Sequence, residues 1–202
     1  MGMLAQTFIE AIIQIIIFTS VPFLWWLISS RKKIGFFEWM GLKRFDNSNS
    51  NKTLLWVVSV ASFFLLLSIL MLYLVRNVQT ATSEFSGKGI VAIPSVLIYA
   101  VLKTSLSEEL LFRGFLLKRI SNHFNFTIGN LIQSILFGLM HGVMFFKINF
   151  IIAIICILFT GIIAWCMGFI NEKKSNGSIL PSWCIHAIAN IFSGICSAIT
   201  LF

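Results

Sequence analysis

Residues 150–170 read FIIAIICILFTGIIAWCMGFI, a run without one charged side chain. As a helix, such a run is long enough to cross the roughly 30 Å hydrocarbon core of a bilayer. The whole chain has the same character, since 58% of its 202 residues are hydrophobic, 11% are charged and the mean hydropathy is +0.94. So few polar residues cannot cover the surface of a water-soluble protein. The sequence therefore predicts an all-α polytopic membrane protein.

Clusters of charge, Asn, Ser and Gly divide the chain into apolar segments of membrane-spanning length. We predict a single transmembrane domain over residues 1–202, built as a bundle of about six transmembrane helices. The predicted helices are Leu4–Leu27, Thr53–Val75, Ile90–Leu117, Phe126–Phe146, Asn149–Ile170 and Ile179–Leu201. The first has no basic segment before its apolar run and no small-residue cleavage site, so we interpret it as a retained membrane helix rather than a signal peptide.

Lys and Arg outnumber Asp and Glu by 15 to 7, which gives a formal net charge of +8. In so apolar a chain we interpret this excess as the positive-inside bias of membrane proteins, and we expect no nucleic-acid partner. Ten Lys and Arg residues lie in the first, third and fifth loops, whereas the other loops hold only Arg76, Lys88 and Lys147. The predicted orientation therefore puts the three basic loops in the cytoplasm and both termini outside.

Ionisable side chains inside membrane helices are costly and by default mark function. Residues 107–113 read SEELLFR, which places two adjacent carboxylates in an apolar helix. Glu109 and Arg113 are four residues apart in the favourable acid-before-base order, so we expect them to pair. Glu108 points about 100° away and keeps its lone pairs for another partner, as a general base would. The pair alone leaves open a purely structural ion cluster that ties helices together.

The fourth predicted helix carries a histidine in the sequence FGLMHG, residues 137–142. Phe137 and His141 are one turn apart and share a face. Gly138 and Gly142 form a small-x-x-x-small step, which lets another helix come close to the histidine. A lone histidine in a membrane helix is often only a hydrogen-bonded packing residue, so this motif is weak by itself.

The sixth predicted helix contains HAIAN, residues 186–190, which projects His186 and Asn190 from one face. These two side chains would complete a metal site with Glu108 and His141, or would donate hydrogen bonds to a developing oxyanion. A polar clasp between helices is the structural alternative, for which Asn is well suited.

The three motifs occur in the order Glu-Glu-x-x-x-Arg, Phe-x-x-x-His and His-x-x-x-Asn on three polar-bearing membrane helices. In this combination the chain closely resembles the CPBP family of intramembrane proteases, also called the Abi family. That family includes type II CAAX prenyl endopeptidases and bacterial proteins linked to bacteriocin processing and immunity. The resemblance begins at the third helix, so we expect a catalytic CPBP-like core at residues 90–202 and two non-diagnostic helices within residues 1–89.

The resemblance implies a role for each motif residue. Glu108 and His141 would activate the attacking water, and His186 and Asn190 would stabilise the tetrahedral oxyanion or ligate a metal. The supporting residues that it implies are Glu109, Arg113 and Phe137. The family has been described both as metalloproteases and as metal-independent glutamate proteases. The expected cofactor is therefore one divalent ion, zinc, or none.

As a zinc site, the ligand set would be Glu108, His141, His186 and Asn190, although Asn is an uncommon zinc ligand. The expected function is hydrolysis of a peptide bond in a peptide or membrane-associated protein, by direct water attack. Neither Gly-x-Ser-x-Gly nor His-Glu-x-x-His is present, which argues against serine-type and gluzincin-type chemistry.

Two alternatives belong to other classes of protein. The first is a non-enzymatic bacteriocin-immunity or peptide-binding membrane protein. The second is an ion-coupled transporter, although no inverted repeat is visible. The expected partners are a peptide or membrane-protein substrate and the lipid bilayer, and the abundance of Ile, Phe, Lys and Asn favours a bacterial cell membrane. The substrate and the oligomeric state stay open.

The predicted helix boundaries leave the motif residues at unequal depths. Counted from the cytoplasmic helix ends at about 1.5 Å per residue, Glu108 lies roughly 15 Å deep, His186 roughly 10 Å and His141 roughly 22 Å. Helix tilt, a helix that starts before Phe126, or unwinding near Gly138 would be needed to bring them together.

Overall fold

The computed structural model describes residues 2–44 and 50–201, and within these ranges the protein is all helical, with no strand. The uninterrupted long helices are α1 (Met3–Ser29), α3 (Ser50–Leu74), α7 (Phe126–Gly142), α8 (Phe150–Lys174) and α9 (Leu180–Ala198). A further continuous helix, called the third span, runs from Gly89 to His123. The short elements outside these helices are α2 (Phe36–Trp39), η2 (Ser83–Phe85) and η6 (Val143–Phe145).

The third span is assembled from segments of different helical winding. They are η3 (Gly89–Ala92), α4 (Ile93–Ile98), η4 (Tyr99–Leu106), α5 (Ser107–Glu109), η5 (Leu110–Leu117) and α6 (Lys118–His123). The wide π-helical turns of η4 and η5 flank α5, the short segment that carries both carboxylates. Since π-helical turns are rare and often occur at functional sites, this winding marks α5 as a place to look for chemistry.

Five of the described helices are long and apolar enough to cross a membrane: α1, α3, the third span, α7 extended to Phe145, and α8. The sixth, α9, is not among these five, and it combines apolar residues with polar ones such as Ser182, His186 and Asn190. At about 1.5 Å per residue its length is close to the thickness of a bilayer core. The prediction of an all-α membrane bundle is confirmed.

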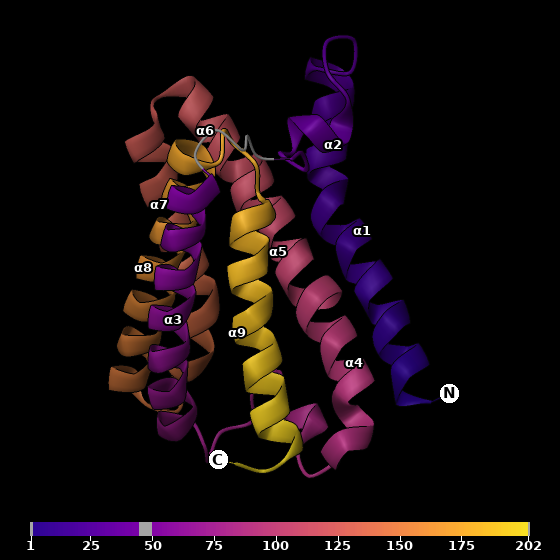
Figure 1. Cartoon of the computed structure of the whole chain (residues 1–202), viewed down its shortest axis with the longest axis vertical. Helices are drawn as coiled ribbons and strands as arrows, with labels where there is room; N and C mark the ends of the chain where they lie inside the picture. The colour runs from indigo at the N-terminus through magenta and orange to yellow at the C-terminus, as the bar shows by residue number, and fades with distance from the viewer. Residues whose placement is uncertain (1, 45–49, 202) are drawn as a thin grey trace.

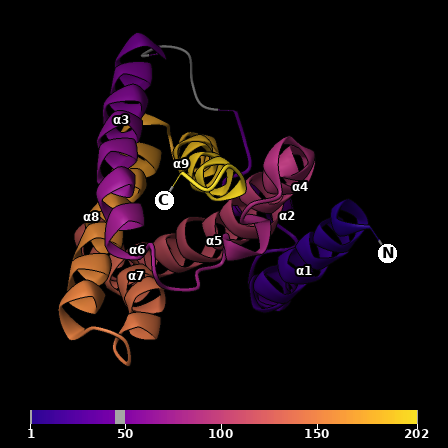
Figure 2. The same ribbon diagram turned by 90° about the horizontal axis from the view of Figure 1, so that it is seen from below.

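The helices stand side by side, and the loops gather at two ends (Figure 1). We call one the basic end, formed by residues 30–44, 118–125 and 171–179, which lies at the top of Figure 1 with α2 and α6. The opposite end is formed by residues 75–89 and 143–149. Figure 2 shows α9 between the α3–α8 pair and the third span, with α1 on the outer side of the third span.

The bundle has a well-packed interior and an apolar exterior. Side chains of α3, α8 and α9 form one core cluster, whose buried members are Val60, Ala61, Ile163, Met167, Ile170 and Ile185. In contrast, Ile16 and Ile17 of α1 are 60% and 61% exposed, and Leu66 of α3 is 67% exposed. A surface this apolar is stable against lipid rather than water.

One ionic contact joins α1 to the third span. Lys103 Nζ lies 2.7 Å from Glu10 Oε2, and Gln6 Nε2 donates to Glu10 Oε1 at 3.0 Å. The two charged groups therefore satisfy each other across the helices, and Gln6 of α1 also donates to Glu10. Glu10 and Lys103 hold the bundle together and stand apart from the histidines.

Helices α7 and α8 approach each other closely at two glycines, as the small-x-x-x-small step predicts. A Cβ added at Gly138 would lie 2.5 Å from the carbonyl oxygen of Ile157, and one at Gly142 would lie 2.8 Å from that of Ala153. No real Cβ makes such contacts, so a side chain at either position would force the helices apart. The step serves packing within the chain and fixes the helix that carries His141.

The third span extends past its predicted end at Leu117 and continues as helix to His123. Its extra turns remain helical because Lys118 Nζ bonds the Gly177 carbonyl oxygen at 2.7 Å and pairs with Glu172, which satisfies a charge that we expected in a loop. Helix α7 then begins at Phe126, as predicted, with Asn125 as its N-cap.

The end of the third span at His123, rather than Leu117, removes most of the predicted difference in depth between Glu108, His141 and His186. Glu108 and His141 now lie the same number of residues from the turn that joins their helices, so they are level. Helix α9 begins below α6 in Figure 1. His186 is level with Glu108, since its Nε2 lies 3.7 Å from Glu108 Oε2. Neither an earlier start of α7 nor unwinding at Gly138 is needed.

Candidate active site

Glu109 lies at the centre of a buried ionic cluster. Arg113 Nη1 donates to Glu109 Oε1 at 2.9 Å, and neither side chain is exposed at all. His186 Nδ1 lies 3.0 Å from the same oxygen, and the Ser182 hydroxyl donates to the other one, Oε2. We call these four residues the Glu109 cluster. The expected pairing of Glu109 with Arg113 is present, and both oxygens of this carboxylate are engaged.

Glu108 faces the other way and has no such partners. Its Oε2 is buried and makes no hydrogen bond within the described residues. The same atom lies 3.7 Å from His141 Nε2 and 3.7 Å from His186 Nε2. These separations are too long for direct hydrogen bonds, and one water molecule could bridge them. The structure thus brings together three of the predicted site residues, Glu108, His141 and His186, around one point.

The second nitrogen of each imidazole determines what the first can do. His141 Nδ1 lies 2.9 Å from the carbonyl oxygen of Phe137, which can only accept, so Nδ1 carries the proton. His186 Nδ1 likewise faces the Glu109 carboxylate. In the neutral form both Nε2 atoms therefore present lone pairs toward Glu108. Three electron-rich atoms converge on one point, an arrangement that attracts a water molecule, a proton or a cation.

Asn190 lies on the same face of α9, one turn beyond His186, but it is held differently. Its Nδ2 donates to Thr104 Oγ1 at 2.8 Å and to Ser105 Oγ at 3.1 Å. These bonds fix the amide against the third span. Asn190 therefore lines the site without touching the Glu108 carboxylate or either imidazole through a recorded hydrogen bond.

Phe137 separates the two faces of the site. Its ring centroid lies 4.3 Å from that of His141, 5.0 Å from that of Phe112 and 4.3 Å from Arg113 Cζ. It is 2% exposed. The aromatic ring thus lies close both to His141 and to the guanidinium of the Glu109 cluster, and its supporting role stays a prediction.

A cavity of about 280 Å³ opens in front of Glu108. Its walls come from α3, the third span, α7, α8 and α9, and are mostly apolar. The four predicted catalytic residues are among its lining: Glu108, His141, His186 and Asn190. An apolar pocket with a few convergent polar groups is the usual form of a small-molecule or peptide site.

The donor atoms at this point fit zinc chemically. Two imidazoles and one carboxylate are an accepted catalytic zinc set, and each imidazole is oriented by a second hydrogen bond, as in metal sites. Within residues 2–44 and 50–201, however, no group of three or more His, Cys, Asp or Glu side chains has the arrangement expected of metal ligands. The predicted fourth ligand, Asn190, is tied to Thr104 and Ser105 through its nitrogen.

Three polar residues of the site escaped the sequence prediction: Ser182, Thr104 and Ser105. Ser182 completes the Glu109 cluster, and the other two hold Asn190. A signal for two of them was present, because Ser182 lies four residues before His186, and Thr104 lies four residues before Glu108. Polar residues one helical turn from a motif residue share its face.

The fold and the site together define a helical membrane protein with a Glu-His-His arrangement on the wall of a mostly apolar cavity. Residues 90–192, about half of the chain, match the family described as type II CAAX prenyl endopeptidase Rce1-like. The chain belongs to this family, which confirms the resemblance drawn from the three motifs. The matched segment contains all four predicted catalytic residues.

The chain is also similar to the UPF0177 protein YxdF of Lactococcus lactis subsp. lactis (strain IL1403). The two are 30% identical over 157 residues, which cover 74% of this chain and 79% of the relative. No solved structure matches the chain.

Proposed function

We propose that the protein is an intramembrane endopeptidase that hydrolyses a peptide bond with a water molecule activated by Glu108 and His141. The observation that carries this proposal is the buried Glu108 Oε2, which lacks a hydrogen-bond partner among the residues that the structure describes and faces two imidazole nitrogens at 3.7 Å. A carboxylate left in this way in an apolar cavity is costly and needs a functional reason. Membership of the endopeptidase family supports the same conclusion.

In the proposed reaction, the water donates one hydrogen to Glu108 Oε2 and the other to His141 Nε2. Its lone pair then points toward the carbonyl carbon of the substrate. As the C–O bond forms, Glu108 takes the proton, and the carbonyl oxygen becomes an oxyanion. Glu108 then delivers the proton to the leaving nitrogen, and the C–N bond breaks. The carboxylate thus serves as general base and then as general acid.

His186 and Asn190 are the proposed donors to the oxyanion. In its protonated form His186 donates from Nε2 while Nδ1–H stays on Glu109. Asn190 already donates to Thr104 and Ser105, so it must give up one of these bonds to reach the oxyanion. Donors positioned before the charge develops stabilise it strongly in a cavity that excludes water.

Zinc, when bound, would be held by Glu108, His141 and His186, and would acidify the attacking water. The proton transfers described above need only the side chains of the chain itself. We therefore expect cleavage to persist in excess zinc chelator. Loss of cleavage that added Zn²⁺ restores would instead assign a metalloprotease.

The test is cleavage of a quenched-fluorescent peptide library by the detergent-purified protein. Glu108→Gln and His141→Ala should each lower cleavage by about 10²–10⁴-fold. Glu10→Gln, which removes a membrane carboxylate that does not line the cavity, should retain it. Cleavage that survives both site substitutions would refute the proposed roles. Peptide binding without cleavage, equal in wild type and Glu108→Gln, would favour the non-enzymatic alternative.

The five candidate spans and the bacterial relative support a place in a bacterial membrane. The substrate would then be a peptide or a protein segment that reaches the bilayer. An immunity role is compatible with this chemistry, since cleavage of a bacteriocin would itself protect the cell.

A further inference from the structure

The cavity extends from Glu108 in one direction only. On the third span its lining residues Tyr99 and Thr104 lie between Glu108 and the start of the span at Gly89. On α9 the lining begins at His186 and continues to Ser193, again toward the opposite end. On both helices, therefore, the residues that line the cavity lie between the level of Glu108 and the end of the bundle opposite the basic end.

The other three walls agree. The lining residues of α3 lie in its C-terminal half, those of α8 in its N-terminal half, and those of α7 and η6 toward the end of that segment. They include Met71, Met144, Phe145, Cys156 and Phe159. On each of these elements the lining lies in the part that leads to residues 75–89 or 143–149, which form the opposite end.

The direction toward the basic end is closed. There the Glu109 cluster fills the space behind Glu108, and Glu109, Arg113 and Ser182 are fully buried. Phe112 and Phe137, 4% and 2% exposed, seal the gap beside it. Among the described residues that line the cavity, none belongs to α6 and none precedes His186 on α9.

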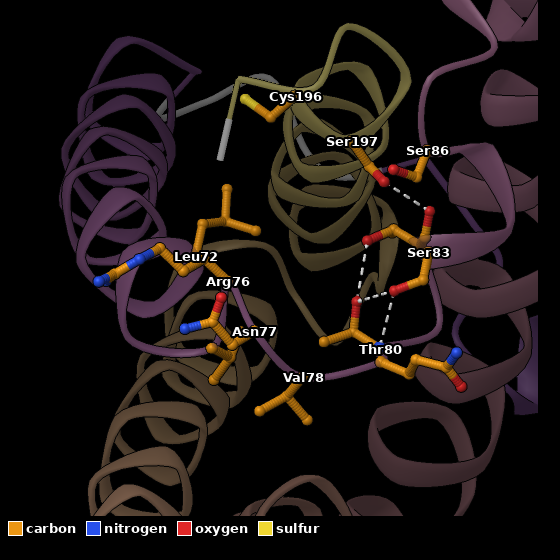
Figure 3. Close-up of a pocket in the computed structure, with 12 residues that line it drawn as sticks. Leu72, Arg76, Asn77, Val78, Thr80, Ser83, Ser86, Cys196 and Ser197 are labelled. Carbon is orange, nitrogen blue, oxygen red and sulfur yellow. Dashed lines mark hydrogen bonds between the residues drawn. The ribbon is translucent and has the colours of Figure 1, made fainter.

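A second pocket of about 390 Å³ lies at the opposite end, between the end of α3, the segment before η2, and the end of α9 (Figure 3). Its lining is rich in hydroxyl and amide groups, and includes Asn77, Gln79, Thr80, Ser83, Ser86 and Ser197. We call this pocket the polar mouth. Four residues line both the polar mouth and the cavity, so the two pockets are direct neighbours: Leu72, Val75, Thr80 and Thr82.

Hydrogen bonds hold the rim of the polar mouth in place. The Thr80 N–H donates to Ser83 Oγ at 2.9 Å, and Ser197 Oγ donates to the Thr82 carbonyl at 2.8 Å. The second bond ties the loop to the end of α9. Asn77 and Ser86 are exposed and make no recorded side-chain hydrogen bond within the described residues, so their polar groups remain available to a bound chain.

We propose that the substrate reaches Glu108 through the polar mouth, from the non-cytoplasmic side of the membrane. The side follows from the positive-inside rule, which places the basic end in the cytoplasm. The substrate class is an extended peptide segment with apolar side chains next to the scissile bond and a polar flank in the mouth. A cavity of about 280 Å³ accepts a few side chains of an unfolded segment and no folded domain. This inference rests on the proposed peptidase function.

The first test blocks one end at a time. In a background with the four native cysteines replaced by alanine, Ser86→Cys places a thiol at the polar mouth, and Ser29→Cys, also at an exposed serine, places one near the basic end. Coupling to a maleimide-polyethylene glycol should lower peptide cleavage at least tenfold in the first variant and leave it unchanged in the second. The reverse pattern, or block at neither position, would overturn the access route.

The second test needs no peptidase activity. In the same background, Ser193→Cys places a thiol in the cavity wall, and a small membrane-impermeant methanethiosulfonate reagent is added to intact cells or to inverted membrane vesicles. We expect reaction in cells and not in inverted vesicles. Reaction only in inverted vesicles would overturn the proposed side. If no peptide is cleaved but this labelling pattern holds, the peptidase function fails while the access route stands.

Discussion

Glu108 and Glu109 are neighbours in the sequence, yet they lie on two faces of one helix with opposite surroundings. On the Glu109 face, Arg113, Ser182 and His186 satisfy both carboxylate oxygens, and no solvent reaches them. On the Glu108 face, Oε2 has no hydrogen-bond partner among the described residues, and Glu108 lines the cavity. Adjacent residues of a helix point about 100° apart, so one carboxylate is paired in the protein interior while its neighbour faces the cavity.

The two faces are linked by His186. Its Nδ1 belongs to the Glu109 cluster, whereas its Nε2 faces Glu108. The rigid, fully paired face therefore fixes the orientation of an imidazole on the reactive face. Such support is what holds a reactive group in its productive geometry.

The largest expected effect comes from Glu108→Gln, which keeps the shape of the side chain and removes the base. Cleavage should fall by about 10²–10⁴-fold, the usual contribution of general acid–base catalysis. The midpoint of thermal unfolding in detergent should stay the same, because Glu108 Oε2 accepts no hydrogen bond from any described residue that the substitution could remove. A fall in that midpoint as large as for a Glu109 variant would contradict the claim that Glu109, and not Glu108, stabilises the fold.

Glu109→Ala should act mainly on stability. Removal of one partner of a buried pair leaves the other charge uncompensated, at a cost of about 3–5 kcal/mol. Arg113 is fully buried, so it would be that charge. Unfolding in a denaturing detergent, followed by circular dichroism, measures the change.

A matched double variant sharpens this prediction. Glu109→Leu together with Arg113→Met removes both charges and should recover much of the stability lost in Glu109→Ala. Cleavage should stay low, because His186 Nδ1 would lack its carboxylate. If the double variant is as unstable as the single one, the pairing is not what stabilises this face.

Asn190→Ala should lower kcat by about 10²–10³-fold, the usual effect of losing one oxyanion donor. The KM should change less, since the amide acts on the charge that develops in the reaction. Thr104→Val, which removes one of the two hydroxyls that hold this amide, should have a smaller effect of the same kind. Equal effects on kcat and KM would indicate that Asn190 only shapes the cavity.

Ser182→Ala is the mildest of these changes. It leaves Glu109 Oε2 without its hydroxyl donor, which should destabilise the protein by about 1–3 kcal/mol. Ser193→Ala, on the same helix but outside the Glu109 cluster, is the control for unfolding and should leave the midpoint unchanged. A stable Ser182→Ala variant would show that Arg113 and His186 are enough for this carboxylate.

Sequence alone could predict most of the helices, because uncharged runs such as residues 150–170 have few other stable arrangements in a bilayer. It placed the end of the third span too early. Lys118 and Arg119 looked like loop residues, but Lys118 pairs with Glu172, and the Arg119 guanidinium lies 3.9 Å from the centre of the Trp39 ring. Those partners are distant in the sequence, so no local pattern reveals them.

The same limit applies to the candidate site. The spacing of Glu109 and Arg113 predicts their pairing, because both lie on one helix. That His186 would join this pair, and that Asn190 would be held by Thr104 and Ser105, depends on how α9 packs against the third span. Packing between helices decides which polar groups meet. The one-turn spacing of Ser182 and His186 indicates that they share a face of α9, but not which residues that face contacts.

The glycine contact between α7 and α8 also limits how the sequence can change over evolution. Gly138 meets the carbonyl oxygen of Ile157 most closely, whereas Gly142 meets the Ile157 side chain and the carbonyl oxygen of Ala153. Many substitutions on the outward face of α8 would therefore leave the position of His141 intact. Either glycine, in contrast, tolerates no replacement, so divergent homologues that keep the histidine should keep both glycines.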